Sequence, residues 1–272
     1  MQSVTEQTDF VLVDRPRPDI ALVTLNRPER MNSMAFDVMV PLKKVLDELN
    51  YDNAVRVIVL TGAGRGFSSG ADHKSAGSVP HTEGLTRPSF ALRSMEILDD
   101  VILALRKMHQ PVIAAVNGAA IGGGLCLALA CDIRIASTNA RFGLPETNLG
   151  ILPGGGGTVR MARMVGVGVA KDMILGGRTL KAEEAKTLGL VWKVVEQDQL
   201  LAEATEIAKG IMKKGPIALD LAKRLINHAF DVDMTAALDA ECWAFSVLMN
   251  TEDKQEGTTA FLEKRDANFK KR

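Results

Sequence analysis

The sequence contains few cysteines and no excess of either charge. Its three cysteines, Cys126, Cys131 and Cys242, lack metal-ligand spacing, as is typical of reduced thiols in a cytosolic protein. Lysine plus arginine balance aspartate plus glutamate at 33 each, so the overall charge provides no attraction to nucleic acid or to an acidic membrane. The four histidines are not paired at metal-ligand intervals either. We therefore expect a small-molecule ligand, with no nucleic acid and no metal.

The chain also lacks an obvious export or membrane segment. Its first ten residues, MQSVTEQTDF, contain neither a basic region nor an apolar stretch, so we expect no secretory signal and a cytoplasmic location. One uncharged run, residues 111–131, is long enough to span a bilayer. Four glycines and Asn117 interrupt this run, and a strand, a turn and a buried helix explain it better than a membrane span.

The composition is that of a globular protein with a large core. The chain has 272 residues, of which 46% are hydrophobic and 24% are charged. β-rich runs alternate with helical patterns, which predicts an α/β fold; the runs lie at residues 20–25, 55–61, 111–116 and 132–136. After about residue 200 only helical patterns follow, at residues 200–214, 217–230, 234–249 and 251–269. An earlier helix is expected at residues 34–50, with Ser33 as its N-cap and Pro41 as a kink or a later start.

Three segments are marked by glycines and by one acidic residue. FSSGAD covers residues 67–72, IGGGLCLALACD covers residues 121–132, and FGLPETNLGILPGGGGT contains Glu146. The first two segments follow the strand-like runs VRVIVLTG and PVIAAVNG. Backbone N–H groups are exposed where such a strand gives way to a turn or a helix. Two donors of this kind can form an oxyanion hole.

These three segments resemble those of the crotonase superfamily, the enoyl-CoA hydratases and isomerases, and the likeness runs from about residue 20 to the C-terminus. The resemblance implies a crotonase (ClpP-like) spiral of ββα units with a C-terminal all-helical region. It places the two oxyanion donors on the backbone amides of Ser69 and Gly123, and the catalytic acid/base on Glu146. It also implies a homotrimer or a dimer of trimers. No separate cofactor is implied, since CoA is part of the substrate.

The chain departs from the family pattern just beyond the second glycine segment. Family hydratases carry GGGxE there, whereas this chain has Cys126 in place of the glutamate. A neutral thiol substitutes poorly for a carboxylate, and we interpret Cys126 as a buried apolar side chain. The expected activity is that of an enoyl-CoA hydratase. The alternatives are a Δ3,Δ2-enoyl-CoA isomerase that uses Glu146 alone and a non-catalytic acyl-CoA-binding protein.

The resemblance also indicates which residues contact the CoA substrate. Arg30 and Met31 occupy the adenine-side position, and Phe261 and Lys264 match residues that reach the CoA of a neighbouring subunit. The remaining candidates lie in the two glycine segments or directly after the first one, and are Ser69, Gly70, Ala71, Asp72, His73 and Gly122. We accordingly expect a core with the acyl-CoA site over residues 1–200. Residues 201–272 are expected to form a helical subdomain for trimerisation and CoA contact.

Other motifs favour less specific interpretations. Residues 66–70 fit the G-x-S-x-G pattern of hydrolases, but a loop follows them instead of a helix. The run Gly154–Gly157 lacks the lysine of a phosphate-binding loop and is expected to be a tight turn that starts a helix. Residues 75–89 are rich in glycine, proline, serine and threonine, which predicts a loop, and we treat a lid over the acyl pocket as a hypothesis.

Overall fold

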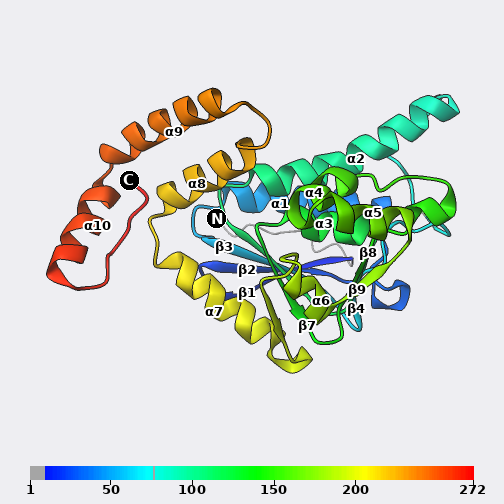
Figure 1. The fold of residues 1–272 in the computed structure, drawn as a ribbon, viewed down its shortest axis with the longest axis horizontal. Helices are drawn as coiled ribbons and strands as arrows, with labels where there is room; N and C mark the ends of the chain where they lie inside the picture. The colour runs from blue at the N-terminus through cyan, green and yellow to red at the C-terminus, as the bar shows by residue number, and fades with distance from the viewer. Residues whose placement is uncertain (1–9, 76) are drawn as a thin grey trace.

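The computed structural model describes residues 10–75 and 77–272. No secretory signal was predicted for the first ten residues. Of these, only Phe10 is among the described residues. Two sheets and a set of helices make up the fold (Figure 1). No helix in the described part of the chain is long and apolar enough to cross a membrane. The uncharged run at residues 111–131 forms the predicted strand and short buried helix, with a second, unpredicted strand at residues 119–121 between them.

The larger sheet has six strands in the order β1-β2-β3-β5-β7-β10. Only β1 runs antiparallel to its neighbour. The strands are β1 (Val11–Arg17), β2 (Ile20–Leu25), β3 (Val57–Gly62), β5 (Val112–Val116), β7 (Ile133–Ser137) and β10 (Lys193–Val195). Every residue of β3 and β5 is buried, which is typical of parallel strands covered on both faces. The four runs predicted as strands correspond to β2, β3, β5 and β7.

The smaller sheet has four strands in the order β4-β6-β8-β9. Its strands are β4 (Gly66–Ser68), β6 (Ala119–Ile121), β8 (Arg141–Gly143) and β9 (Thr179–Lys181). A strand of the larger sheet, a strand of this smaller sheet and a helix follow one another along the chain three times, beginning at β3, β5 and β7. This repeated ββα unit confirms the predicted α/β spiral.

The helices cover both faces of the larger sheet. Up to the end of that sheet they are α1 (Phe36–Tyr51), α2 (Arg87–Lys107), α3 (Gly123–Ala130), α4 (Gly157–Val165), α5 (Val167–Leu175) and α6 (Ala182–Thr187). The C-terminal helices are α7 (Leu200–Met212), α8 (Pro216–His228), α9 (Met234–Met249) and α10 (Glu252–Glu263). Short 3-10 helices are η1 (Pro28–Arg30), η2 (Glu146–Leu149) and η3 (Gln197–Gln199). In β3, Ile58 packs into the core with α1, α2 and α3, whereas Val57 and Val59 face α7, because successive side chains point to opposite faces.

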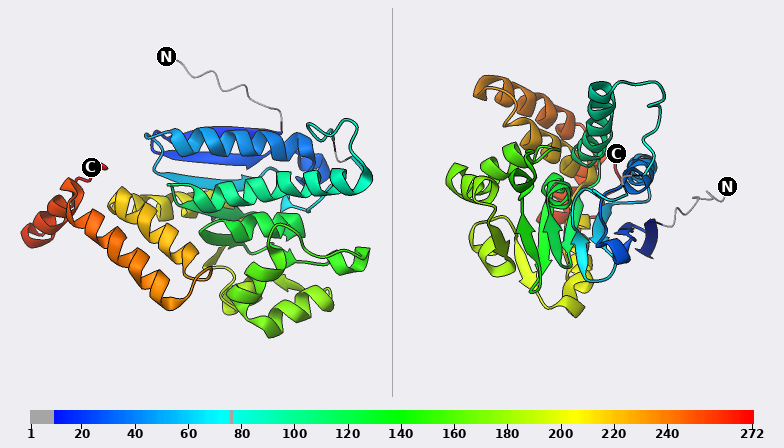
Figure 2. Two further views of the ribbon diagram at one scale, coloured as in Figure 1. Left: turned by 90° about the horizontal axis from the view of Figure 1, so that it is seen from above. Right: turned by 90° about the vertical axis from the view of Figure 1, so that its right-hand side faces the viewer.

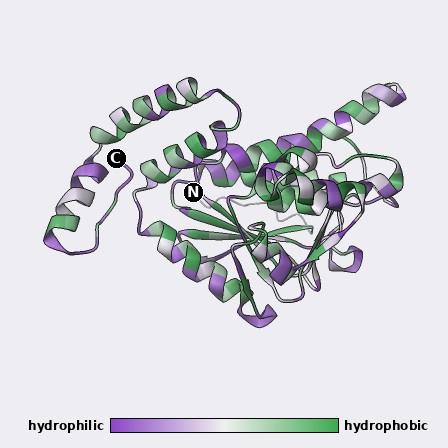
Figure 3. Cartoon of the chain, viewed as in Figure 1, coloured by the Kyte–Doolittle hydropathy of each residue, from purple (hydrophilic) through white to green (hydrophobic). Residues whose placement is uncertain are grey.

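The last helices project away from the sheets. Helix α7 packs on the sheet through Leu200, Ala204 and Ala208. Lys223 of α8 donates to the Leu105 and Gln110 carbonyls, so the projecting elements are α9 and α10 (Figure 2). Helix α8 buries only Lys223 and α9 buries no residue. Figure 3 shows hydrophobic stretches along α9 nonetheless. The exposed large hydrophobic residues of this helix are Met234, Leu238, Trp243, Phe245, Val247 and Met249.

Two local predictions about helices were wrong. Helix α1 begins at Phe36 with Ala35 as its N-cap and no side-chain cap, because the Ser33 hydroxyl donates instead to the Asp72 carboxylate at 3.1 Å. Pro41 lies inside this helix. No helix was predicted at residues 87–107, where α2 lies, four positions before the strand predicted at residues 111–116. Helix α2 replaces the end of the predicted loop, which now covers residues up to Thr86.

Candidate active site

The three glycine-marked segments meet because they follow neighbouring strands of the smaller sheet. Strands β4, β6 and β8 run parallel and side by side. Their carboxyl ends therefore lie at the same edge. Ser69 follows β4, Gly122 follows β6, and Glu146 begins η2 shortly after β8. The pairing of short strands thus assembles residues that are more than 70 positions apart in the sequence.

The glycines at this edge allow the backbone segments to approach closely. A Cβ on Gly122, whose φ is +55°, would lie 3.1 Å from Glu146 Oε1. A Cβ on Gly70, whose φ is +87°, would lie 2.7 Å from the Ile121 carbonyl oxygen and 3.2 Å from the Gly123 nitrogen. Any other residue would be strained at these φ values and would push the segments apart.

Two backbone N–H groups at this edge lack a backbone acceptor within residues 10–75 and 77–272. Gly123 is the first residue of α3, and the first N–H groups of a helix have no partner inside it. Ala71 forms an isolated β-bridge with Met34. In that bridge the Met34 N–H donates to the Gly70 carbonyl at 2.7 Å, and the Asp72 N–H donates to the Met34 carbonyl at 3.2 Å. The Ala71 N–H takes no part in it.

The predicted first oxyanion donor, Ser69, does not fit this geometry. Its N–H already donates to the Met31 carbonyl at 2.9 Å. The Ala71 nitrogen, in contrast, lies 3.9 Å from where a Cβ on Gly123 would stand. The pair of neighbouring free amides is therefore Ala71 and Gly123, and two such groups can together hold an oxyanion.

Glu146 presents a carboxylate that few protein groups stabilise. Its side chain is partly buried, and its Oε2 atom is buried without a hydrogen-bond partner in the described part of the chain. Burial raises the pKa of this carboxyl above its ordinary value. A carboxylate with a raised pKa is suited to accept and return a proton near neutral pH.

Cys126 is fully buried beside this carboxylate, as the sequence predicted. Burial, followed by the nearby Glu146 carboxylate, raises the pKa of the Cys126 thiol to about 12. A Cβ on Gly157 would lie 2.7 Å from its sulfur, so Cys126 packs closely against the start of α4. At neutral pH the thiol is protonated, and it cannot replace a carboxylate as a base.

We predict that Cys126→Ala leaves turnover essentially unchanged, because a neutral buried thiol contributes packing and no proton transfer. The variant should lose about 1 kcal/mol of unfolding free energy through the smaller side chain. Steady-state kinetics and thermal unfolding would measure the two effects. A large loss of turnover in a folded variant would instead assign the thiol a chemical role.

Several residues predicted to contact CoA form a cluster around Asp72. Its carboxylate accepts hydrogen bonds from Arg27 at 2.9 Å and from Arg30 at 3.1 Å. Met31 has a left-handed backbone, and its sulfur lies 3.0 Å from Arg65 Nε. His73 is exposed next to this cluster. The sequence singled out Ser33 only as a helix cap. It did not place Arg27, Ser33 or Met34 in this cluster, because their partners lie far away in the chain.

The two C-terminal residues predicted to contact CoA lie elsewhere. Phe261 is 82% exposed near the end of α10, and Lys264 is the C-cap of that helix. Helix α10 is at the opposite end of the molecule from β8 (Figure 1), and Glu146 follows β8 by three residues. Phe261 and Lys264 therefore do not reach the Glu146 site of the same chain.

The alternative motifs correspond to structural features. Ser68, the serine of the G-x-S-x-G pattern, is fully buried at the end of β4, and its hydroxyl oxygen accepts from the Gly70 N–H at 3.3 Å. Gly154–Gly157 forms a turn that packs against Met95 of α2 and starts α4. Within the described ranges no group of histidine, cysteine, aspartate or glutamate side chains could hold a metal ion.

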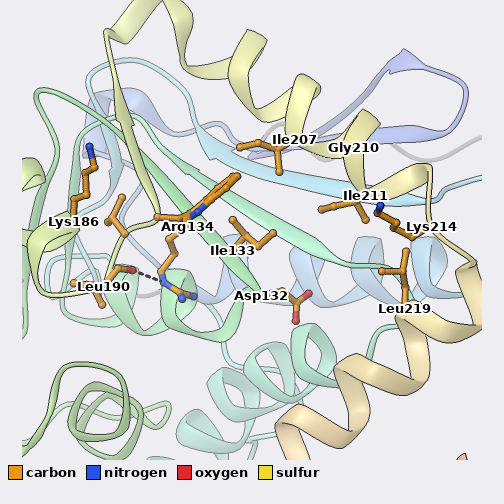
Figure 4. Close-up of a pocket in the computed structure, with 13 residues that line it drawn as sticks. Asp132, Ile133, Arg134, Lys186, Leu190, Ile207, Gly210, Ile211, Lys214 and Leu219 are labelled. Carbon is orange, nitrogen blue, oxygen red and sulfur yellow. Dashed lines mark hydrogen bonds between the residues drawn. The ribbon is translucent and has the colours of Figure 1, made fainter. Parts of the chain in front are cut away.

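A cavity of about 690 Å³ lies apart from this edge (Figure 4). Ile133, Leu190, Ile207 and Ile211 contribute its apolar wall. The partly buried Arg134 side chain also lines it and donates to the Leu190 carbonyl at 2.9 Å. None of the residues predicted to bind or transform a substrate lines this cavity.

Comparison with known proteins identifies the family of this chain. The sequence model of the family described as Enoyl-CoA hydratase/isomerase matches residues 17–272. The chain is 54% identical over 268 residues to a probable enoyl-CoA hydratase, EchA12, of Mycobacterium bovis, with 94% of this chain and 91% of that protein covered.

Two solved structures are similar to this one. The crystal structure of a probable enoyl-CoA hydratase/isomerase from Mycobacterium abscessus has a TM-score of 0.91 and 48% identity, covering 97% of this chain and 99% of that one. A monofunctional enoyl CoA isomerase from M. smegmatis has a TM-score of 0.73 and 48% identity, covering 85% and 99% of the two chains. By sequence and by fold, the chain belongs to the enoyl-CoA hydratase/isomerase family of the crotonase superfamily.

Proposed function

We propose that this protein is an enoyl-CoA hydratase/isomerase that acts on unsaturated fatty acyl-CoA thioesters. The observation that carries the proposal is the position of Glu146, whose carboxylate has a pKa raised by burial. Close to it lie the free amides of Ala71 and Gly123. The amides hold the thioester oxygen, and the carboxylate moves protons at the adjacent carbons.

Ala71 and Gly123 are the proposed oxyanion donors. As the α-carbon loses a proton, or as the β-carbon gains an oxygen, negative charge moves onto the thioester oxygen. The two N–H groups stabilise this enolate without moving, since the peptide backbone fixes them. Losing one such donor typically costs about 100-fold to 1000-fold in rate.

Hydration by one carboxylate requires Glu146 to act twice. It first takes a proton from water while the hydroxyl oxygen bonds to the β-carbon and an enolate forms. The protonated Glu146 then returns that proton to the α-carbon, which completes the addition of water. Cys126 takes no part in these transfers, because its thiol has a pKa of about 12 and stays neutral.

The second candidate is a Δ3,Δ2-enoyl-CoA isomerase, and the neutral Cys126 favours it. Here Glu146 removes a proton from the α-carbon of a 3-enoyl thioester. The double bond moves to the 2-position as the same proton is returned to the γ-carbon. This reaction needs neither water nor a second carboxylate, so a single base is sufficient.

Separate incubation with a trans-2-enoyl-CoA and a cis-3-enoyl-CoA tests these proposals. Addition of one water to the first substrate, seen by mass spectrometry, supports the hydratase. Conversion of only the second substrate, at unchanged mass and resolved by chromatography, supports the isomerase. If CoA binds and neither substrate reacts, the protein is a non-catalytic acyl-CoA-binding member of the family.

The proposed CoA contacts extend beyond one chain. We place the nucleotide part of CoA near Arg30 and Met31, and we place Phe261 and Lys264 against the CoA of a neighbouring subunit. The distance of α10 from Glu146 within one chain and the uncovered hydrophobic residues of α9 support a homotrimer or a dimer of trimers.

Because CoA enters as part of the substrate, no cofactor is proposed. The exposed free thiol of Cys242 fits a reducing compartment such as the cytoplasm.

If Phe261 contacts the CoA of a neighbour, Phe261→Ala should raise the KM for enoyl-CoA by about 10-fold with kcat unchanged, as expected for loss of one buried aromatic contact. The KM for the matching pantetheine thioester, which lacks the nucleotide, should not change. Leu262→Ala is the matched control, since Leu262 is the next residue on α10 and is 73% exposed. An unchanged KM in Phe261→Ala would contradict this contact.

A further inference from the structure

The carboxylate of Asp72 holds the segment that carries Arg30. Asp72 Oδ2 accepts from Arg27 Nη1 at 2.9 Å and from the Ser33 hydroxyl at 3.1 Å. Arg30 Nη2 donates to both carboxylate oxygens, at 3.1 and 3.2 Å. Three side chains from residues 27–33 thus converge on one acid, although about 40 residues separate them from it in the sequence.

The same carboxylate also orders its own loop. The N–H groups of Lys74 and Ser75 each donate to Asp72 Oδ1 at 2.9 Å. The Asp72 side chain is only 4% exposed. Burial opposes its ionisation, but the hydrogen bonds from the Ser75 and Lys74 amides and from neighbouring side chains hold its pKa well below the ordinary value. With its oxygens fully occupied by protein donors, Asp72 is not free to bind CoA itself.

Asp72 is also the direct neighbour of a free amide. Its N–H donates to the Met34 carbonyl at 3.2 Å, and the Met34 N–H donates to the Gly70 carbonyl at 2.7 Å. These two bonds bracket Ala71. The Met34 sulfur lies 3.2 Å from where a Cβ on Gly123 would stand. The segment held by Asp72 therefore reaches both proposed oxyanion donors.

We infer that Asp72 is a positioning residue that couples the CoA contact of Arg30 to the placement of the Ala71 amide at the thioester oxygen. This inference rests on the proposed function. Arg30 lies within the CoA-side segment and Ala71 lies at the reacting carbonyl, and the Asp72 carboxylate holds both in a fixed relation. Removing its charge should therefore affect binding of the nucleotide and the chemical step together.

Asp72→Asn tests the coupling, because it keeps the shape of the side chain but faces the two arginines with a neutral amide. We expect kcat to fall by about 10-fold to 100-fold, the size of effect that a small misplacement of reacting groups produces. The KM for enoyl-CoA should rise as well. With a pantetheine thioester, which lacks the nucleotide, only kcat should fall.

The infrared carbonyl frequency of a bound saturated acyl-CoA, labelled with ¹³C at the thioester carbonyl, measures the oxyanion contact without turnover. The frequency should drop when the label binds the native protein and return toward its solution value in Asp72→Asn. Asp47→Asn is the control, since Asp47 is an exposed α1 carboxylate paired with Lys43, and it should match the native protein. If Asp72→Asn fails to fold, Ser33→Ala, which removes one donor to the carboxylate, should shift the frequency in the same direction by a smaller amount.

A folded Asp72→Asn variant with native carbonyl frequency and native kcat would overturn the inference. A rise in KM alone would also overturn it, because Asp72 would then serve only the nucleotide contact. If the native protein converts no enoyl-CoA, the proposed function fails, whereas the carbonyl frequency still decides whether Asp72 positions the Ala71 amide.

Discussion

Glu146→Gln is expected to lower turnover of enoyl-CoA by about 100-fold to 10,000-fold, the usual contribution of a positioned general base. The substitution preserves the shape of the side chain but removes its capacity to take up a proton. Binding of CoA thioesters should change little, since the proposed coenzyme contacts lie on other segments. Steady-state kinetics and calorimetric titration with a saturated acyl-CoA would separate the two effects.

The pH dependence provides a second test of the same residue. Burial raises the pKa of Glu146, and the reaction needs its ionised form. Turnover should therefore decline as the pH falls through this raised pKa, at a higher pH than an ordinary glutamate would give. An acid limb at the pKa of an exposed glutamate would contradict the assignment, as would undiminished turnover in Glu146→Gln.

The stability of Glu146→Gln distinguishes loss of function from loss of structure. Because the folded-state pKa is raised, the protonated carboxyl favours the folded protein at low pH, and this contribution is lost as the pH rises through the folded pKa. At neutral pH the ionised, half-buried carboxylate is destabilising. The glutamine variant should then be at least as stable as the native protein, as thermal unfolding at neutral and acidic pH would show.

Gly70→Ala is expected to reduce kcat by about 100-fold, comparable to the loss of one oxyanion donor. The new Cβ would stand 2.7 Å from the Ile121 carbonyl oxygen and 3.2 Å from the Gly123 nitrogen. It would force apart the two segments that carry the proposed donors. The thioester carbonyl frequency and kcat should change together, and the KM for enoyl-CoA should change less.

Gly84→Ala is the matched control for Gly70→Ala. Gly84 has a φ of +75°, close to the +87° of Gly70, but a Cβ there would meet nothing within 4 Å. Both variants should lose about 1–2 kcal/mol of stability from left-handed backbone strain, and only Gly70→Ala should lose turnover. Equal kinetics in the two folded variants would contradict the proposed oxyanion site.

Much of the fold could be predicted from local patterns. Strands β2, β3, β5 and β7 form where apolar runs occur, since parallel strands buried on both faces need continuous hydrophobic residues. Helix α9 spans the predicted residues 234–249. Helix α2 was missed because its first half, with Phe90, Leu92 and Met95, is largely exposed and gives a weak amphipathic pattern.

The sequence predicted which segments form the candidate site, but it did not predict the hydrogen bonds between them. The sequence by itself determined that two glycine segments and Glu146 belong to one site, and that Cys126 replaces the first family glutamate. Only the tertiary structure decided that the Ser69 amide donates to Met31, and that the Ala71 amide meets no backbone acceptor among the described residues. The physical reason is that a hydrogen-bond donor is satisfied only where folding brings an acceptor close to it. Local sequence shows which groups can donate, whereas the packing of distant segments decides which donors remain for a substrate.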